Sequence, residues 1–277
     1  MQEKEITHKG KKIFYKSIGE GPVVVLLHGV PFDGSLWNNQ ISALNSFHLI
    51  IPDLPGSGRS EMIGDMSVEG MAECVKEIIV HETASLFFKS GEPHSVVLIG
   101  HSMGGYIALA LAEKYPELLN GLGLFHSTAY ADSEERKQTR KKIIEGIQQN
   151  GAGEFIRTSV PNLFSAVTKE KNPGLIEKQI NYSNKFSAEA IVSYQTAMMQ
   201  RPERTTVLKN SRIPVLFILG KYDNAVPLKD GLEQCSLPDL AYIHILENAG
   251  HVGMNEEPIE SNIILANYLK NTCHHTR

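Results

Sequence analysis

Cysteine is scarce in the sequence, and long apolar runs are missing. Of 277 residues three are cysteine, Cys74, Cys235 and Cys273, and they lie far apart. A secreted disulfide framework normally has an even set, so we expect a reducing, cytoplasmic location. The longest apolar run of the N-terminal half, residues 23–27, is far below the roughly 20 residues that cross a bilayer. No apolar stretch of signal-peptide length follows residues 1–5, so neither export nor a membrane partner is expected.

Positive charge does not dominate either. Lys and Arg number 27 against 31 Asp and Glu, a net charge of −4, and no basic block stands out. Nucleic acid is therefore not an expected partner. There is no His-Glu-x-x-His segment and no paired cysteine spacing, so we predict no metal and no cofactor. The tail, residues 273–277, reads CHHTR and is expected to be a frayed terminus rather than a metal site.

Short apolar runs alternate with helical patterns, which is typical of a mostly parallel sheet flanked by helices. Residues 6–8 and 11–17 suggest a hairpin at the sheet edge. The buried strands are expected at residues 23–27, 49–51, 95–99, 122–125, 215–219 and 242–246, and the main helices at 67–89, 103–114 and 258–270.

The sequence pattern changes between the fourth and the fifth of these predicted strands. Residues 127–212 contain no comparable β-forming run, but charged helical stretches broken by Gly and Pro. The sequence therefore predicts an α/β core of residues 1–126 and 213–277, interrupted by a helical insertion at 127–212.

The most specific motif is GHSMGG at residues 100–105, between a predicted strand and a predicted helix. It matches the G-x-S-x-G nucleophile elbow, in which a serine occupies a strained turn at the carboxyl edge of the sheet. Small residues two positions before and after Ser102 let the strand and the helix approach closely. We therefore predict that Ser102 is a nucleophile.

A serine hydroxyl needs a neighbouring base. Asp223 and His251 each follow a predicted strand, and with Ser102 they give the chain order serine, acid, histidine that accompanies this type of elbow. His251 would move the proton, and Asp223 would fix the imidazole tautomer. The oxyanion would be held by the backbone N–H groups of Met103, directly after the nucleophile, and Val30, in the loop after an early strand. His28 in that loop is expected to shape it.

These segments resemble the α/β-hydrolase fold superfamily, in its cap-bearing serine hydrolase form. The resemblance rests on residues 28–31, 53–60, 100–105, 220–223 and 249–251, and it implies that residues 127–212 form a helical cap over the pocket. Residues 201–204, RPER, are also loosely similar to the 3-oxoadipate enol-lactonase and small carboxylesterase group.

The nucleophile narrows the chemistry. Related enzymes that open epoxides or displace halide carry aspartate at the elbow, whereas this chain carries Ser102. The resemblance therefore implies a serine hydrolase that cleaves an ester or lactone of a small molecule through an acyl-enzyme. A carbon–carbon bond hydrolase, a cofactor-free perhydrolase and a ligand receptor that retains the triad are the alternatives. Substrate and oligomeric state stay open.

Two further sets of residues were candidates for the pocket. His126 ends the predicted strand 122–125 and is expected to point toward the pocket, with substrate contact and a structural role both open. In the insertion, large apolar side chains are candidates either for the pocket lining or for helix packing: Phe155, Phe164, Tyr182, Phe186, Tyr194, Met198 and Met199.

Overall fold

A computed structural model describes residues 1–90 and 95–273; the side chains of 85–90 and the predicted frayed end at 274–277 lie outside that description. Its centre is an eight-stranded sheet in the order β1-β2-β4-β3-β5-β6-β7-β8. The strands are β1 (Gln2–His8), β2 (Lys11–Ile18), β3 (Val23–Leu27), β4 (His48–Pro52), β5 (Val96–His101), β6 (Leu119–Phe125), β7 (Val215–Gly220) and β8 (Ala241–Leu246).

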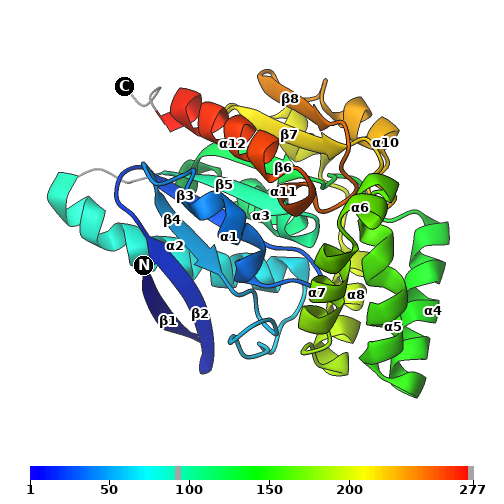
Figure 1. The fold of residues 1–277 in the computed structure, drawn as a ribbon. Helices are drawn as coiled ribbons and strands as arrows, with labels where there is room; N and C mark the ends of the chain where they lie inside the picture. Colours follow the sequence, from blue (N-terminus) through cyan, green and yellow to red (C-terminus); the bar gives the residue numbers. More distant parts are fainter. Residues whose placement is uncertain (91–94, 274–277) are drawn as a thin grey trace.

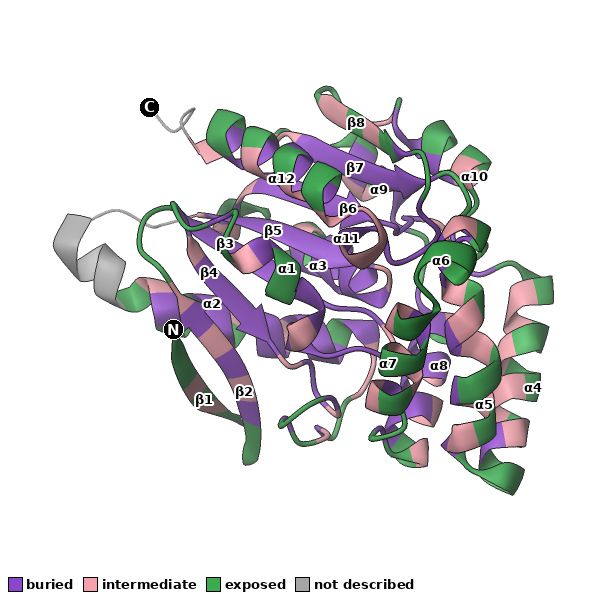
Figure 2. Ribbon diagram, in the orientation of Figure 1, coloured by how far each residue is buried: buried purple, intermediate pink, exposed green. Residues whose placement is uncertain are grey.

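The sheet is mostly parallel, as predicted. The hairpin β1–β2 is antiparallel and joins β4 in antiparallel fashion, while every pair from β4 to β8 is parallel. Every residue of β3, β5 and β7 is buried, and Figure 2 shows these strands in purple. Strands buried on both faces read as continuous apolar runs, which explains the pattern in the sequence.

Helices cover both faces of the sheet (Figure 1). One face carries α1 (Asn38–Ile41), α11 (Gly253–Glu256) and α12 (Pro258–Cys273), and the other carries α2 (Val68–Ser90) and α3 (Met103–Lys114). The connection from β7 to β8 contains α10 (Leu228–Gln234), and the short 3-10 turns η1 (Gly34–Trp37) and η2 (Pro116–Leu118) complete the core. None of the helices in the described ranges has both the length and the apolar character needed to cross a bilayer.

Residues 127–212, all within the described part, form helices and no strand. They are α4 (Glu134–Asn150), α5 (Ala152–Ser159), η3 (Val160–Leu163), α6 (Ala166–Lys171), α7 (Pro173–Ser183), α8 (Ala188–Gln200) and α9 (Thr205–Lys209). Ser133, Ser165 and Ser187 cap α4, α6 and α8, each accepting a hydrogen bond from a backbone N–H three residues on.

Hydrogen bonds join this helical segment directly to the core. The Tyr194 hydroxyl donates to the Pro55 carbonyl over 2.6 Å, and the Ser183 hydroxyl donates to the Pro31 carbonyl over 2.9 Å. Figure 1 shows α4–α8 gathered at one side of the sheet.

The close approach of α3 to β3 yields a prediction. A Cβ on Gly104 would lie 2.7 Å from the carbonyl oxygens of both Leu27 and His28. Because backbone cannot give way cheaply, Gly104→Ala should lower the free energy of unfolding by roughly 2–4 kcal/mol. A Cβ on Gly146, inside α4, meets nothing within 4 Å, so Gly146→Ala should instead stabilise by about 0.5–1 kcal/mol. Urea unfolding of both variants measures this, and equal effects would contradict the packing argument.

Candidate active site

Ser102 occupies the sharp turn between β5 and α3. Its backbone has φ 51° and ψ −118°, a conformation that a residue other than glycine adopts only under strain. The turn is fixed by two hydrogen bonds, from the Ser102 N–H to the Phe125 carbonyl at 3.0 Å and from the Ser127 hydroxyl to the Ser102 carbonyl at 2.8 Å. The elbow predicted from the motif therefore has the expected backbone geometry.

Asp223 and His251 come together on the loops that follow β7 and β8. The distance from His251 Nδ1 to Asp223 Oδ2 is 2.8 Å, and both side chains are nearly fully buried. Asp223 Oδ1 accepts from the N–H groups of Ala225 and Val226, at 2.7 and 2.9 Å. Burial raises the pKa of Asp223, but the charge and hydrogen bond of His251 outweigh it and the net pKa is lowered. The carboxylate is therefore held ionised beside the imidazole.

The His251 loop is tied to the helical segment through Glu256. One Glu256 oxygen accepts from the N–H groups of Gly250 and Val252, at 2.8 and 3.2 Å. The other accepts from the Ser165 N–H at 2.8 Å and the Thr168 hydroxyl at 2.7 Å. One carboxylate thus joins the loop that carries the histidine to the start of α6.

Two more backbone contacts fix His251 itself. Its N–H donates to the Leu163 carbonyl at 2.7 Å, and its carbonyl accepts from His101 Nε2 at 2.8 Å. His101, which precedes the nucleophile, is fully buried and lies beside the His251 ring, with 5.0 Å between ring centroids. It therefore positions the backbone of His251.

The expectation that His126 points into the pocket is wrong. Its side chain is 0% exposed, and its Nδ1 lies 3.5 Å from Asp223 Oδ2. Nε2 accepts from the Gly253 N–H at 3.1 Å, which leaves the proton on Nδ1, facing the carboxylate. Burial lowers the pKa of His126 to about 3, so the ring is neutral at pH 7. His126 therefore lies beside the same Asp223 oxygen that binds His251, with 5.8 Å between the centroids of the two rings.

A cavity of about 240 Å³ lies above the elbow, and both Ser102 and His251 line it. No hydrogen bond joins their side chains among the described residues; such bonds often tighten only when substrate is bound. Of the apolar candidates in the insertion, Phe155 and Met198 line this cavity. Phe164 and Tyr194 are instead packed in the core.

Some polar residues of the cavity wall were not predicted from the sequence. Arg136 and Arg140 of α4 and Gln195 of α8 all line it. The spacing of the arginines places them on one face of a helix, but α4 has many charged residues, so spacing alone did not separate these two from solvent-facing ones.

The predicted oxyanion donors both adjoin Ser102. Val30 lines the cavity, and a Cβ on the preceding Gly29 would lie 2.8 Å from the Cβ of Ser102. Met103 is the first residue of α3, where a helix leaves its N–H groups without intrahelical partners. Their role as donors stays a prediction.

His28 shapes its loop, as predicted. Its Nε2 accepts from the Leu54 N–H at 2.9 Å and lies 2.9 Å from the Ser57 hydroxyl, while Nδ1 donates to the Gly29 carbonyl at 2.8 Å. The ring thus joins the loop after β3 to the loop after β4.

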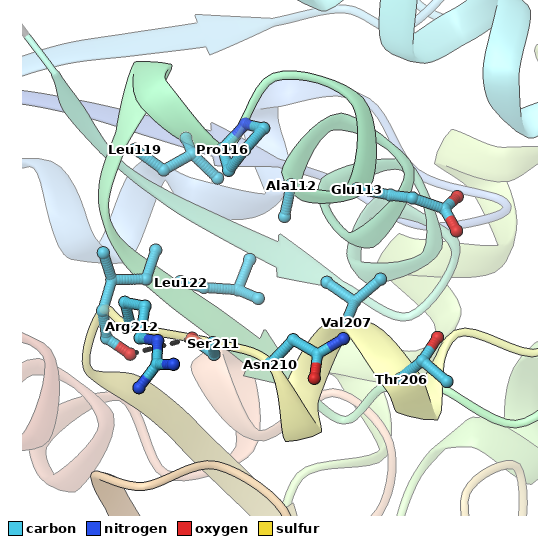
Figure 3. A pocket seen from close by; sticks show the side chains of 11 residues that line it. Ala112, Glu113, Pro116, Leu119, Leu122, Thr206, Val207, Asn210, Ser211 and Arg212 are labelled. Carbon is cyan, nitrogen blue, oxygen red and sulfur yellow. Dashed lines mark hydrogen bonds between the residues drawn. The ribbon is translucent and has the colours of Figure 1, made fainter.

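A larger hollow of about 370 Å³ lies elsewhere, where β6 and β7 begin (Figure 3). Leu119, Leu122 and Ile213 line it, so it lies at the N-terminal ends of these strands, whereas the elbow lies at the C-terminal end of β5. It contains no histidine and no cysteine, and we assign it no chemistry. No cluster of three or more His, Cys, Asp or Glu suited to a metal occurs in the described ranges.

A known protein family matches most of the chain. The sequence profile of the alpha/beta hydrolase fold matches residues 22–258. The chain belongs to the α/β-hydrolase fold family. The predicted fold is thereby confirmed.

Curated relatives of this α/β-hydrolase include pimeloyl-[acyl-carrier protein] methyl ester esterases. The protein of Yersinia enterocolitica is 27% identical over 226 residues, which cover 79% of this chain and 82% of the relative. That of Yersinia pseudotuberculosis is 25% identical over 269 residues, which cover 93% and 97%.

Solved structures resemble it as well. An esterase from Thermogutta terrifontis, solved with malate bound, superposes with a TM-score of 0.89 at 28% identity, covering 98% of this chain and 99% of that one. An enol-lactonase from Burkholderia xenovorans has a TM-score of 0.84 over 96% and 100%. At 21% identity, the second likeness shows the fold alone.

The buried histidines predict a loss of stability in mild acid. Burial lowers the pKa of His28, His101 and His126, the last to about 3. In the unfolded chain the pKa of histidine is about 6.5, so below that pH the unfolded chain binds protons that the folded chain does not. The contribution of these histidines to the free energy of unfolding is therefore fully present above about pH 6.5 and is lost as the pH falls below it. Each histidine contributes about 1.4 kcal/mol per pH unit in this window. Urea unfolding at pH 7.5, 6.5 and 5.5 should show the decline, and a constant free energy of unfolding would contradict it.

Proposed function

We propose that this protein is a serine hydrolase that cleaves a carboxylic ester or lactone of a small molecule through an acyl-enzyme. The observation that carries the proposal is the buried 2.8 Å bond between His251 and Asp223, with His251 and the strained Ser102 lining one cavity. A base oriented by a carboxylate beside a serine elbow is the arrangement that acyl transfer requires.

Each residue has a defined role in the proposed reaction. The Ser102 hydroxyl attacks the carbonyl carbon, and His251 Nε2 takes its proton. Asp223 accepts from Nδ1, holds the tautomer and stabilises the imidazolium. The N–H groups of Val30 and Met103 hold the oxyanion. His251 then returns the proton to the leaving alcohol, and water attacks the acyl-enzyme in the same way to release the acid.

The relatives support the reaction class. Two groups of them, the methyl ester esterases and the Thermogutta esterase, are named for ester hydrolysis, and this chain is an ester-hydrolysing α/β-hydrolase. The cavity of about 240 Å³ beside Ser102 has room for a small ester.

We further propose that residues 127–212 act as a cap on the core 1–126 and 213–277. The cavity wall supports this division, because Phe155, Leu163 and Met198 of the helical segment line it together with Ser102 and His251 of the core. The reducing, cytoplasmic location is part of the same proposal, and the buried positions of Cys74 and Cys235, which form no disulfide, agree with it.

Turnover by serine variants tests the proposal. Ser102→Ala should lower kcat on the best ester found in a panel by at least ~10³-fold, because the acyl-enzyme can no longer form. Ser236→Ala, at an exposed position outside the cavity, should keep the full rate. Urea unfolding should give similar midpoints for both variants. If Ser102→Ala kept the wild-type rate, the assignment would be wrong.

A further inference from the structure

The wall of the active-site cavity has an uneven charge. Two arginines line it, Arg136 and Arg140, and no Asp or Glu is among its lining residues. Ile143, Phe155 and Met198 add apolar side chains to this wall, and Thr139, Ser159 and Gln195 add uncharged polar ones. Positive charge at such a cavity attracts an anionic group more strongly than it would in water, because the protein surroundings screen the charge less.

Arg140 is only partly neutralised. Its Nε is 2.5 Å from Asp132 Oδ2, and its Nη1 donates to Gln195 Oε1 at 2.7 Å. The same Asp132 carboxylate also bonds Arg201 Nη1 at 2.7 Å. One buried carboxylate therefore serves two guanidinium groups, and this cluster keeps a net positive charge.

Arg136 has no carboxylate partner among the described residues. Its Nη2 donates to the carbonyl of Ala225, which lies two residues after Asp223 and also lines the cavity. Glu135 and Asp230 share with Arg136 an outer hollow of about 630 Å³, but neither makes an ion pair with it. Arg136 is thus held at the cavity wall by a neutral acceptor, with other N–H donors left over.

We propose that Arg136, supported by Arg140, binds a carboxylate on the substrate, so that the protein prefers esters whose acyl or alcohol part ends in a carboxylate. This inference rests on the proposed serine-hydrolase function. A cavity of about 240 Å³ equals roughly eight water volumes at ~30 Å³ each, so it has room for a small molecule. The half-esters of short dicarboxylic acids are small enough for it, and their methylene chain suits the apolar side chains of its wall, Ile143, Phe155 and Met198.

The test compares monomethyl succinate and monomethyl glutarate with the corresponding dimethyl esters, which have similar size and no charge. We expect kcat/KM at least tenfold higher for the half-esters. Arg136→Gln should lower kcat/KM for the half-esters at least tenfold more than for the diesters, because a charge-assisted bond is lost only for the charged substrate. Arg136→Lys, which keeps the charge, should retain part of the preference. Arg212→Gln, at a side chain 89% exposed and outside the cavity, should change neither.

The outcomes separate this inference from the proposed function. Hydrolysis of both esters at equal rates, abolished by Ser102→Ala, would overturn the carboxylate site and leave the serine mechanism in place. A preference for half-esters that survives in Arg136→Gln would also overturn the assignment to Arg136. Ester hydrolysis that continues in Ser102→Ala would overturn the mechanism itself.

Discussion

The hydrogen bond between His251 and Asp223 can exist only because the protein compensates for burying a carboxylate. An ionised group removed from water is unfavourable unless its oxygens are hydrogen-bonded. Asp223 meets this condition with the N–H groups of Ala225 and Val226 on one oxygen and His251 on the other, with the neutral ring of His126 beside it. These groups follow three neighbouring strands, so the order β6-β7-β8 is what brings them together.

The same constraint links the sheet to the helical segment. His251 stays in place because the Leu163 carbonyl accepts a hydrogen bond from its N–H. In addition, Glu256 bridges the His251 loop to the N-terminus of α6. Residues of both parts therefore determine where the imidazole lies. A shift of the helical segment would reach the base through backbone hydrogen bonds, whereas the elbow at Ser102 depends on glycine contacts inside the core.

Much of this arrangement could be predicted from local sequence. Buried strands appear as apolar runs because a sheet covered on both faces excludes water from every residue, and the elbow appears because close approach of α3 requires glycine. The support of Asp223 by His126, the bridge made by Glu256 and the arginines of the cavity could not be predicted. Each depends on contacts between residues far apart in the chain, and an isolated histidine, glutamate or arginine has no local pattern that distinguishes such a role from a solvent-exposed one.

The central claim is that Ser102 is an activated nucleophile. Its most direct test is the mass of the intact protein after incubation with a fluorophosphonate probe, followed by peptide mapping. We expect a single adduct on Ser102 that does not form in His251→Ala, because the probe reacts with a serine that a neighbouring base has activated. No adduct in the wild type, or an adduct on Ser102 that forms equally well without His251, would contradict it.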